Sequence, residues 1–153
     1  MKPKTSLLYD VFVLYQSVGA MLGRALSNAP LPPDEYAIYS HIFEYDGCTP
    51  SEMSRDLHMP LQTVSDWLAL LRKREHLSSV INDRDRRSYR VSLTSEGRAL
   101  HQQTSRHFDL VNRIFLKALP RSETEMRSYV DEMIGAARTA AAGLEARALP
   151  RVG

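Results

Sequence analysis

Apolar residues recur at steps of three and four along much of the chain, and this spacing predicts a largely helical protein. The stretch 6–25 carries apolar side chains at Leu8, Val11, Tyr15 and Leu22. Its other apolar residues widen the stripe beyond what one facing helix would cover, so we expect contacts with more than one partner. A proline-rich linker follows and ends this helix, because proline cannot continue a helix.

Two helices are predicted after the linker. The first runs over about 34–45 and is expected to bury five side chains, Tyr36, Ile38, Tyr39, Ile42 and Phe43. The second opens at Thr49, which precedes a proline and is followed three residues later by Glu52. Threonine and glutamate at this spacing can each bond a backbone N–H of the other, which is a capping box. We expect this short helix to end near Leu57.

A further helix and a β-hairpin complete the central part. The helix is predicted over 60–75, with a buried face formed by Leu61, Val64, Leu68 and Leu71. Residues 77–81 and 89–93 are rich in β-prone side chains, and the segment 82–88 between them is polar and turn-forming. The pattern therefore predicts a hairpin directly after the helix.

Two long helices are predicted at the C-terminal end. Thr94 caps the first, and Pro120 ends it. Ser122 and Glu125 form a second capping box, which opens a last helix with apolar residues at heptad steps up to Leu144. The predicted fold is mainly α, in the order α-α-α-α-β-β-α-α, with room for a short extra strand beside the hairpin.

Composition favours one ordinary domain over residues 1–153. With 43% hydrophobic and 25% charged residues, the chain can bury a core without disulfides, and its single cysteine, Cys48, cannot form an internal one. The start of the chain lacks the apolar run of a signal peptide. No stretch approaches the roughly 20 apolar residues of a membrane span. We therefore expect a cytoplasmic protein without a membrane anchor.

The net charge of +2 is unevenly distributed. Between residues 60 and 90 there are seven Lys or Arg against four acids, an excess larger than that of the whole chain. Two short helices joined by a tight turn, the second polar outward and followed by a basic hairpin, fit the requirements of duplex DNA recognition. In that interpretation helix 60–75 enters the major groove and the turn 82–88 meets the minor groove.

The outward face of helix 60–75 carries the candidate base-reading residues Gln62, Thr63, Ser65 and Asp66. Gln62 can make two hydrogen bonds to adenine, Ser65 can donate or accept at several base edges, and Thr63 can reach a phosphate or a thymine methyl. Any one of these residues could also be merely solvated, so the interpretation rests on the set.

The tip of the hairpin carries Arg84, Arg86 and Arg87 within four residues. Arginine gains from the negative potential of a narrow minor groove, and an adjacent carboxylate, here Asp85, can hold the Arg87 guanidinium in position. Arg72 and Lys73 end the preceding helix, where they could contact phosphates or only complement the helix dipole.

In this order of elements, the chain resembles the MarR (multiple-antibiotic-resistance regulator) family of winged helix-turn-helix regulators. Residues 31–100 carry the resemblance, in the segments 49–57, 63–65, 83–87 and 91–97. The most specific part is the wing, with its aspartates and arginines, followed by Leu93-Thr94 and Gly97. The outer helices match only in length, position and amphipathicity.

The resemblance implies a homodimer on a pseudopalindromic operator. It implies a DNA-binding lobe over 31–96 and interleaved dimerisation helices over 5–27 and 95–147. It further implies a repressor released by a small aromatic or amphipathic effector, which binds between the lobe and the dimerisation helices, and a wing arginine, here Arg87, in the minor groove. The apolar stripes of the outer helices favour a dimer independently.

Two departures from the family limit this transfer. Asp66 stands where relatives often carry a basic residue. It would repel phosphate, and it could instead accept from a cytosine amino group or hold a neighbouring arginine in place. Peroxide-sensing relatives keep a cysteine in the first helix, whereas Cys48 lies before the capping box.

Candidate effector-pocket residues are apolar or aromatic side chains and one histidine, namely Phe12, Tyr15, Tyr39, His41 and Phe43. Each could equally fill the core or be satisfied within it. No nucleophile with a base, metal-binding cluster or phosphate-binding glycine loop stands out, so we expect neither an enzyme nor a metal or cofactor. The alternative function is a winged helix that docks protein and does not bind DNA.

Overall fold

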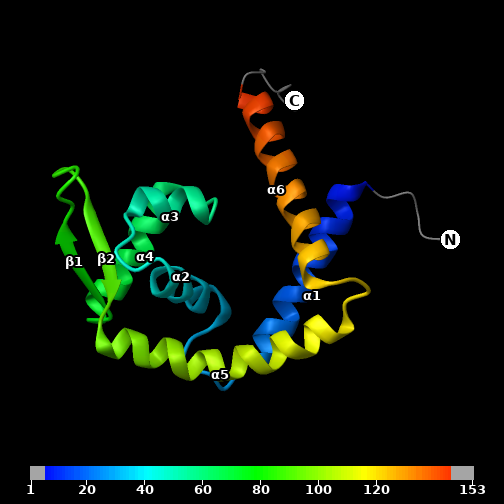
Figure 1. Ribbon diagram of the computed structural model, residues 1–153, viewed down its shortest axis with the longest axis horizontal. Helices are drawn as coiled ribbons and strands as arrows, with labels where there is room; N and C mark the ends of the chain where they lie inside the picture. Colours follow the sequence, from blue (N-terminus) through cyan, green and yellow to red (C-terminus); the bar gives the residue numbers. More distant parts are fainter. Residues whose placement is uncertain (1–5, 146–153) are drawn as a thin grey trace, which may run out of the picture. The chain divides into compact units, whose positions relative to one another are not determined.

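The computed structural model describes residues 6–145, which form six helices and two strands (Figure 1). In chain order they are α1 (Leu7–Ala25), α2 (Pro33–Glu44), α3 (Pro50–Asp56), α4 (Leu61–Lys73), β1 (Leu77–Ile81), β2 (Tyr89–Leu93), α5 (Ser95–Ala118) and α6 (Glu123–Glu145). The predicted order and fold class are confirmed. Of the predicted dimerisation helices, residues 5 and 146–147 lie outside the described residues.

Capping residues set the helix ends largely as the sequence predicted. Thr49 and Glu52 form the expected capping box at α3. Ser122 and Glu125 bond each other's backbone N–H groups at the start of α6, with N···O distances of 3.1 and 3.3 Å. Thr94 accepts a bond from the N–H of Gly97 at 3.2 Å and so caps α5.

Within residues 6–145, two residues other than glycine take positive φ angles, and they flank α4. His58, with φ 52°, lies in the turn before this helix, and Glu75, with φ 61°, lies just after it. A left-handed residue interrupts helical hydrogen bonding, so the backbone defines both ends of α4 sharply.

The hairpin is a two-stranded antiparallel sheet whose register pairs Leu77 with Leu93 and Ile81 with Tyr89. Cys48 adds an antiparallel bridge to Val91, which is the short extra strand contact that the sequence left room for. Burial raises the pKa of the Cys48 thiol to about 11, so the thiol stays protonated at neutral pH.

The chain divides into two compact units, Met1–Val111 and Asn112–Gly153, with a boundary that falls within α5. The core of the first unit joins α2, α3, α4 and the hairpin, and its fully buried side chains include Ile38, Tyr39, Ile42, Met53, Val64, Leu68, Leu71 and Val91. Leu61 is the exception on the predicted buried face of α4. It is 49% exposed, because it occupies the first helical position, ahead of the core.

The N-terminus of α5 is joined to the segment after α4 by main-chain contacts. The Thr94 N–H donates to the His76 carbonyl at 3.1 Å, and the Thr94 hydroxyl donates to the Glu75 carbonyl at 2.9 Å. A Cβ atom at Gly97 would lie 2.5 Å from the same His76 oxygen, so only glycine fits this close approach.

Helix α1 buries none of its residues within the chain, although it is rich in apolar side chains. Leu7, Leu8, Tyr9, Phe12 and Tyr15 are all more than half exposed. In the second unit, Ile114 is 59% exposed and Tyr129 48%. None of the helices within residues 6–145 is both long and apolar enough to span a membrane.

Candidate nucleic-acid interface

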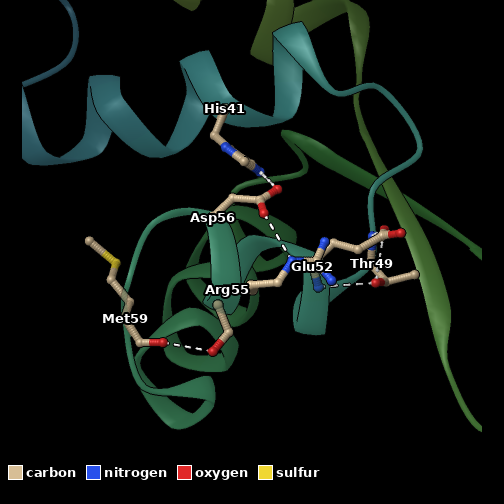
Figure 2. Close-up of polar contacts among 7 residues, drawn as sticks. His41, Thr49, Glu52, Arg55, Asp56 and Met59 are labelled. Atoms are coloured by element: carbon tan, nitrogen blue, oxygen red, sulfur yellow. Dashed lines mark hydrogen bonds and ion pairs between the residues drawn. The ribbon is translucent and has the colours of Figure 1, made fainter. Parts of the chain in front are cut away.

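Side chains of α3 hold the turn that leads into α4 (Figure 2). The Ser54 hydroxyl donates to the Met59 carbonyl at 2.7 Å, and the Met59 N–H donates to the Ser54 carbonyl at 3.1 Å. One oxygen of Asp56 accepts from Arg55 Nε at 3.2 Å, and the other lies 4.0 Å from His41 Nε2. Burial lowers the pKa of His41, against the opposing effect of the Asp56 charge. The Ser54–Met59 bonds hold the turn before α4, and the contact between Asp56 and His41 joins α3 to α2.

The outward face of α4 is polar, as expected for a recognition helix. Gln62 and Asp66 are exposed, whereas Thr63 and Ser65 are half-buried beside them. Gln62 Nε2 donates to Asp66 Oδ1 at 2.9 Å, so the two side chains form one hydrogen-bonded pair. The face therefore offers the glutamine oxygen, the aspartate and two hydroxyls to a partner.

The basic residues at the end of α4 have different surroundings. The Arg72 guanidinium lies 5.4 Å from the centre of the Tyr89 ring, and its Nη2 is 3.4 Å from Ser79 Oγ. These contacts tie α4 to both strands of the hairpin. Lys73 is exposed.

Arg74 turns away from this surface and pairs with Glu35 of α2 through two hydrogen bonds, of 2.6 and 3.2 Å. The hydrogen bonds to Glu35 raise the pKa of Arg74 above its ordinary value. Arg74 is therefore a structural residue that joins α4 to α2.

The wing tip, residues 82–88, is ordered by side chains that bind its own backbone. Buried Asn82 donates to Ser88 Oγ at 2.8 Å and accepts from the Arg84 N–H at 3.2 Å. Asp85 accepts from the Arg87 N–H at 3.0 Å. All three wing arginines, including Arg86, are exposed.

The expected clamp between Asp85 and the Arg87 guanidinium is not formed, because the carboxylate binds the backbone of Arg87 instead. Within residues 6–145, no ion pair joins these two side chains. Asp85 thus shapes the turn, which leaves the guanidinium of Arg87 available to a partner.

The structure separates the five expected pocket residues. The first unit contains a cavity of about 530 Å³, with walls from α1, α2 and α5, and only Phe43 of the five lines it. Tyr39 is fully buried in the core, and His41 faces Asp56. Phe12 and Tyr15 are 56% and 72% exposed on α1.

Sequence reasoning missed three aromatic residues that line this cavity, Tyr36, His101 and Phe108. The His101 ring stacks on Tyr36 and Phe43, with centroid distances of 5.3 and 4.4 Å. Its Nε2 lies 3.1 Å from Ser40 Oγ. The sequence signal that could have identified His101 and Phe108 is their spacing, because one face of α5 carries Gly97, His101, Thr104 and Phe108.

No group of three or more His, Cys, Asp or Glu side chains in the described part of the chain could hold a metal ion. The candidate surface consists of the polar face of α4 and the arginines of the wing.

Several solved structures are similar to this chain over most of its length. The M. tuberculosis transcriptional regulator MOSR in complex with DNA matches with a TM-score of 0.75 and 19% identity, over 89% of this chain and 98% of its own. A MarR transcriptional regulator from Methanosarcina mazei matches with a TM-score of 0.67 and 17% identity, over 86% and 96%. The PcaV transcriptional regulator from Streptomyces coelicolor, with its natural ligand, has a TM-score of 0.66 and 18% identity, over 90% and 99%.

All three are described as transcriptional regulators, and at this level of identity the likeness shows a shared fold. No protein-family model and no curated protein sequence matches the chain.

Proposed function

Since the chain has the winged-helix fold of MarR regulators, we propose that it is a sequence-specific double-stranded DNA-binding transcriptional regulator. The observation that carries this proposal is the exposed polar face of α4 beside the arginine-tipped wing, with Arg72 joining the two through Ser79 and Tyr89. Helix α4 enters the major groove, where Gln62, Thr63, Ser65 and Asp66 meet base edges. Arg84, Arg86 and Arg87 of the wing meet the minor groove, and Arg72 and Lys73 contact phosphates.

The active form is a homodimer. Exposed apolar side chains occur on α1 of the first unit and, separately, on the parts of α5 and α6 that belong to the second unit, and a monomer would leave them in water. A second copy of the chain covers these helices and repeats the recognition helix about 34 Å away, one turn of DNA. Such a dimer reads a pseudopalindromic operator.

Regulation is by repression that a small effector relieves. The cavity between α1, α2 and α5 supports this step, because it is large enough for a small organic molecule and is lined by α2 of the DNA-binding lobe and by α5, a proposed dimerisation helix. The ligand in the similar PcaV structure is a further argument for an effector.

Selection of bound fragments from random duplex DNA tests the proposal directly. We expect an inverted repeat with a fixed spacing between half-sites. Affinity for that repeat should fall steeply with salt, since phosphate contacts release counterions. A winged helix that docks only protein would select no sequence and show no such dependence, and this result would remove the proposal.

A further inference from the structure

The cavity of the first unit has an aromatic wall. Tyr36 and Phe43 of α2 and Phe108 of α5 line it, and the Tyr36 and Phe108 rings lie 5.1 Å apart between centroids. Leu22 of α1 and Leu26, the residue that follows this helix, close the apolar part. Ring faces carry negative electrostatic potential, so they attract cations as well as apolar groups.

The charges on the cavity wall are all negative. Glu44 and Asp109 line it, and among the described residues that do so there is no lysine or arginine. The Arg98 guanidinium lies 5.6 Å from the centre of the Phe43 ring. Arg98 pairs with Asp46 at 3.1 Å, so its charge is already compensated outside the cavity wall.

His101 supplies an unsatisfied polar atom on the same wall. The residue is only 6% exposed, and its Nδ1 has no hydrogen-bond partner. Burial lowers the pKa of His101, against the opposing charges of Glu44 and Asp109. The lowered pKa favours the neutral ring, which would not offset the two acids.

We propose that this cavity binds an organic cation with an aromatic or apolar body, such as an arylalkyl ammonium. The aromatic wall receives the body, while Glu44 and Asp109 attract the charge. A carboxylate ligand of the same shape is repelled by both acids and finds no cation to pair with. This assignment names the chemical class of the effector and therefore rests on the proposed function.

Matched probes of opposite charge test the assignment. We would titrate the DNA-free protein with 2-phenylethyl trimethylammonium and with 3-phenylpropionate, and follow binding by NMR. The cation should bind roughly tenfold more tightly than the anion, as two partly solvated carboxylates predict. Equal affinity, or preference for the anion, overturns the proposal.

Variants locate the effect in the cavity. The double variant Glu44→Gln and Asp109→Asn keeps side-chain shape and should weaken cation binding roughly tenfold. The matched control, Asp131→Asn with Glu132→Gln, removes the same charge from exposed positions on α6 and should leave the affinity unchanged. Equal losses in the two double variants would mean that the cation responds only to net charge, and would overturn the site.

Experiments with and without DNA separate this proposal from the proposed function. The cation titration uses no DNA, so cation preference in a protein that selects no DNA sequence refutes the regulator and supports the cavity. Sequence-specific DNA binding without cation preference supports the regulator and refutes the proposed cation site. Where both hold, adding the cation to the protein–DNA complex should release the DNA, and the effector role fails if it does not.

Discussion

Gln62 and Asp66 lie one turn apart on the exposed face of α4 and share a hydrogen bond of 2.9 Å from Nε2 to Oδ1. Bidentate reading of adenine uses both the amide nitrogen and the amide oxygen of a glutamine. The Asp66 carboxylate engages one of the two N–H groups of Gln62 Nε2, which orients the amide and leaves the other N–H for a base. The negative charge of Asp66 would repel phosphate and so lower the affinity of this face for DNA in the proposed complex.

Replacing Asp66 by Asn should raise affinity for duplex DNA of any sequence, roughly threefold at low salt, because one negative charge leaves the interface. Fluorescence anisotropy with an unrelated duplex measures the change. Asp131→Asn makes the same charge change in the second unit and should have little effect. An unchanged or weaker affinity for Asp66→Asn would show that this carboxylate does not face DNA.

The substitutions Arg87→Ala and Gln62→Ala should have different effects on DNA binding. Loss of Arg87 weakens binding to most sequences alike and lowers the salt dependence by about one counterion. Loss of Gln62 changes preference at one base pair, by about 1–3 kcal/mol. Binding to a panel of single-base operator variants separates the two effects, with Arg121→Ala as a control outside the lobe. Sequence-neutral losses from both would defeat the assignment.

Arg74 and Lys73 are neighbours with different predicted roles. Arg74→Gln breaks the pair with Glu35, whose side chain is 15% exposed, and should lower the free energy of unfolding by about 1 kcal/mol. The salt dependence of DNA binding by the Arg74→Gln variant should stay unchanged. Lys73→Ala should reduce that salt dependence and leave stability alone. Denaturant unfolding and DNA binding at two salt concentrations test both variants. If Arg74→Gln lowered the salt dependence and Lys73→Ala lowered the stability, the assigned roles would be wrong.

The capping carboxylate of α3 makes stability depend on pH. The Thr49 N–H and hydroxyl donate to Glu52 at 2.7 and 2.9 Å, and the pKa of Glu52 is lowered by these bonds. Because the folded pKa lies below the unfolded one, the stabilisation is complete above the ordinary glutamate pKa of about 4.3 and is lost as pH falls through the folded value.

Glu52→Gln keeps a capping side chain that does not titrate. It should therefore flatten the fall of Tm with decreasing pH below about pH 4. Thermal unfolding followed by circular dichroism measures the slope. Glu132→Gln, on exposed α6, provides the comparison, and identical slopes for Glu52→Gln and the unmodified protein would contradict the role of the cap.

The proposed dimer makes a prediction for α1. Leu8 is 79% exposed, so Leu8→Arg should cost little within the chain but should break the contact with a second copy. Light scattering at micromolar concentration should give a dimer for the unmodified protein and a monomer for the variant, with unchanged helical content. A monomer in both cases would refute the dimer.

The elements predicted most accurately from the sequence depend on residues a few positions apart. The capping boxes at Thr49 and Ser122 and the bounds of the hairpin are of this kind. The cavity could not be predicted in the same way, because Tyr36 and His101 meet only after α2 and α5 pack. The Asp85 carboxylate was expected to contact the guanidinium of Arg87, but it accepts from the Arg87 backbone N–H. Which of these two groups the carboxylate binds depends on the geometry of the turn.

Gly97 brings the main chain of α5 against the peptide that follows α4, with no side chain between them. His101 lies one turn further along α5, on the cavity wall. In the proposed regulator, a ligand that tilts this turn would displace the peptide after α4 directly, without a relay of rotamer changes. The proposed ligand site and the proposed recognition helix would then be joined by main chain alone, and the rigidity of that contact would set how much of the ligand's binding energy reaches the operator.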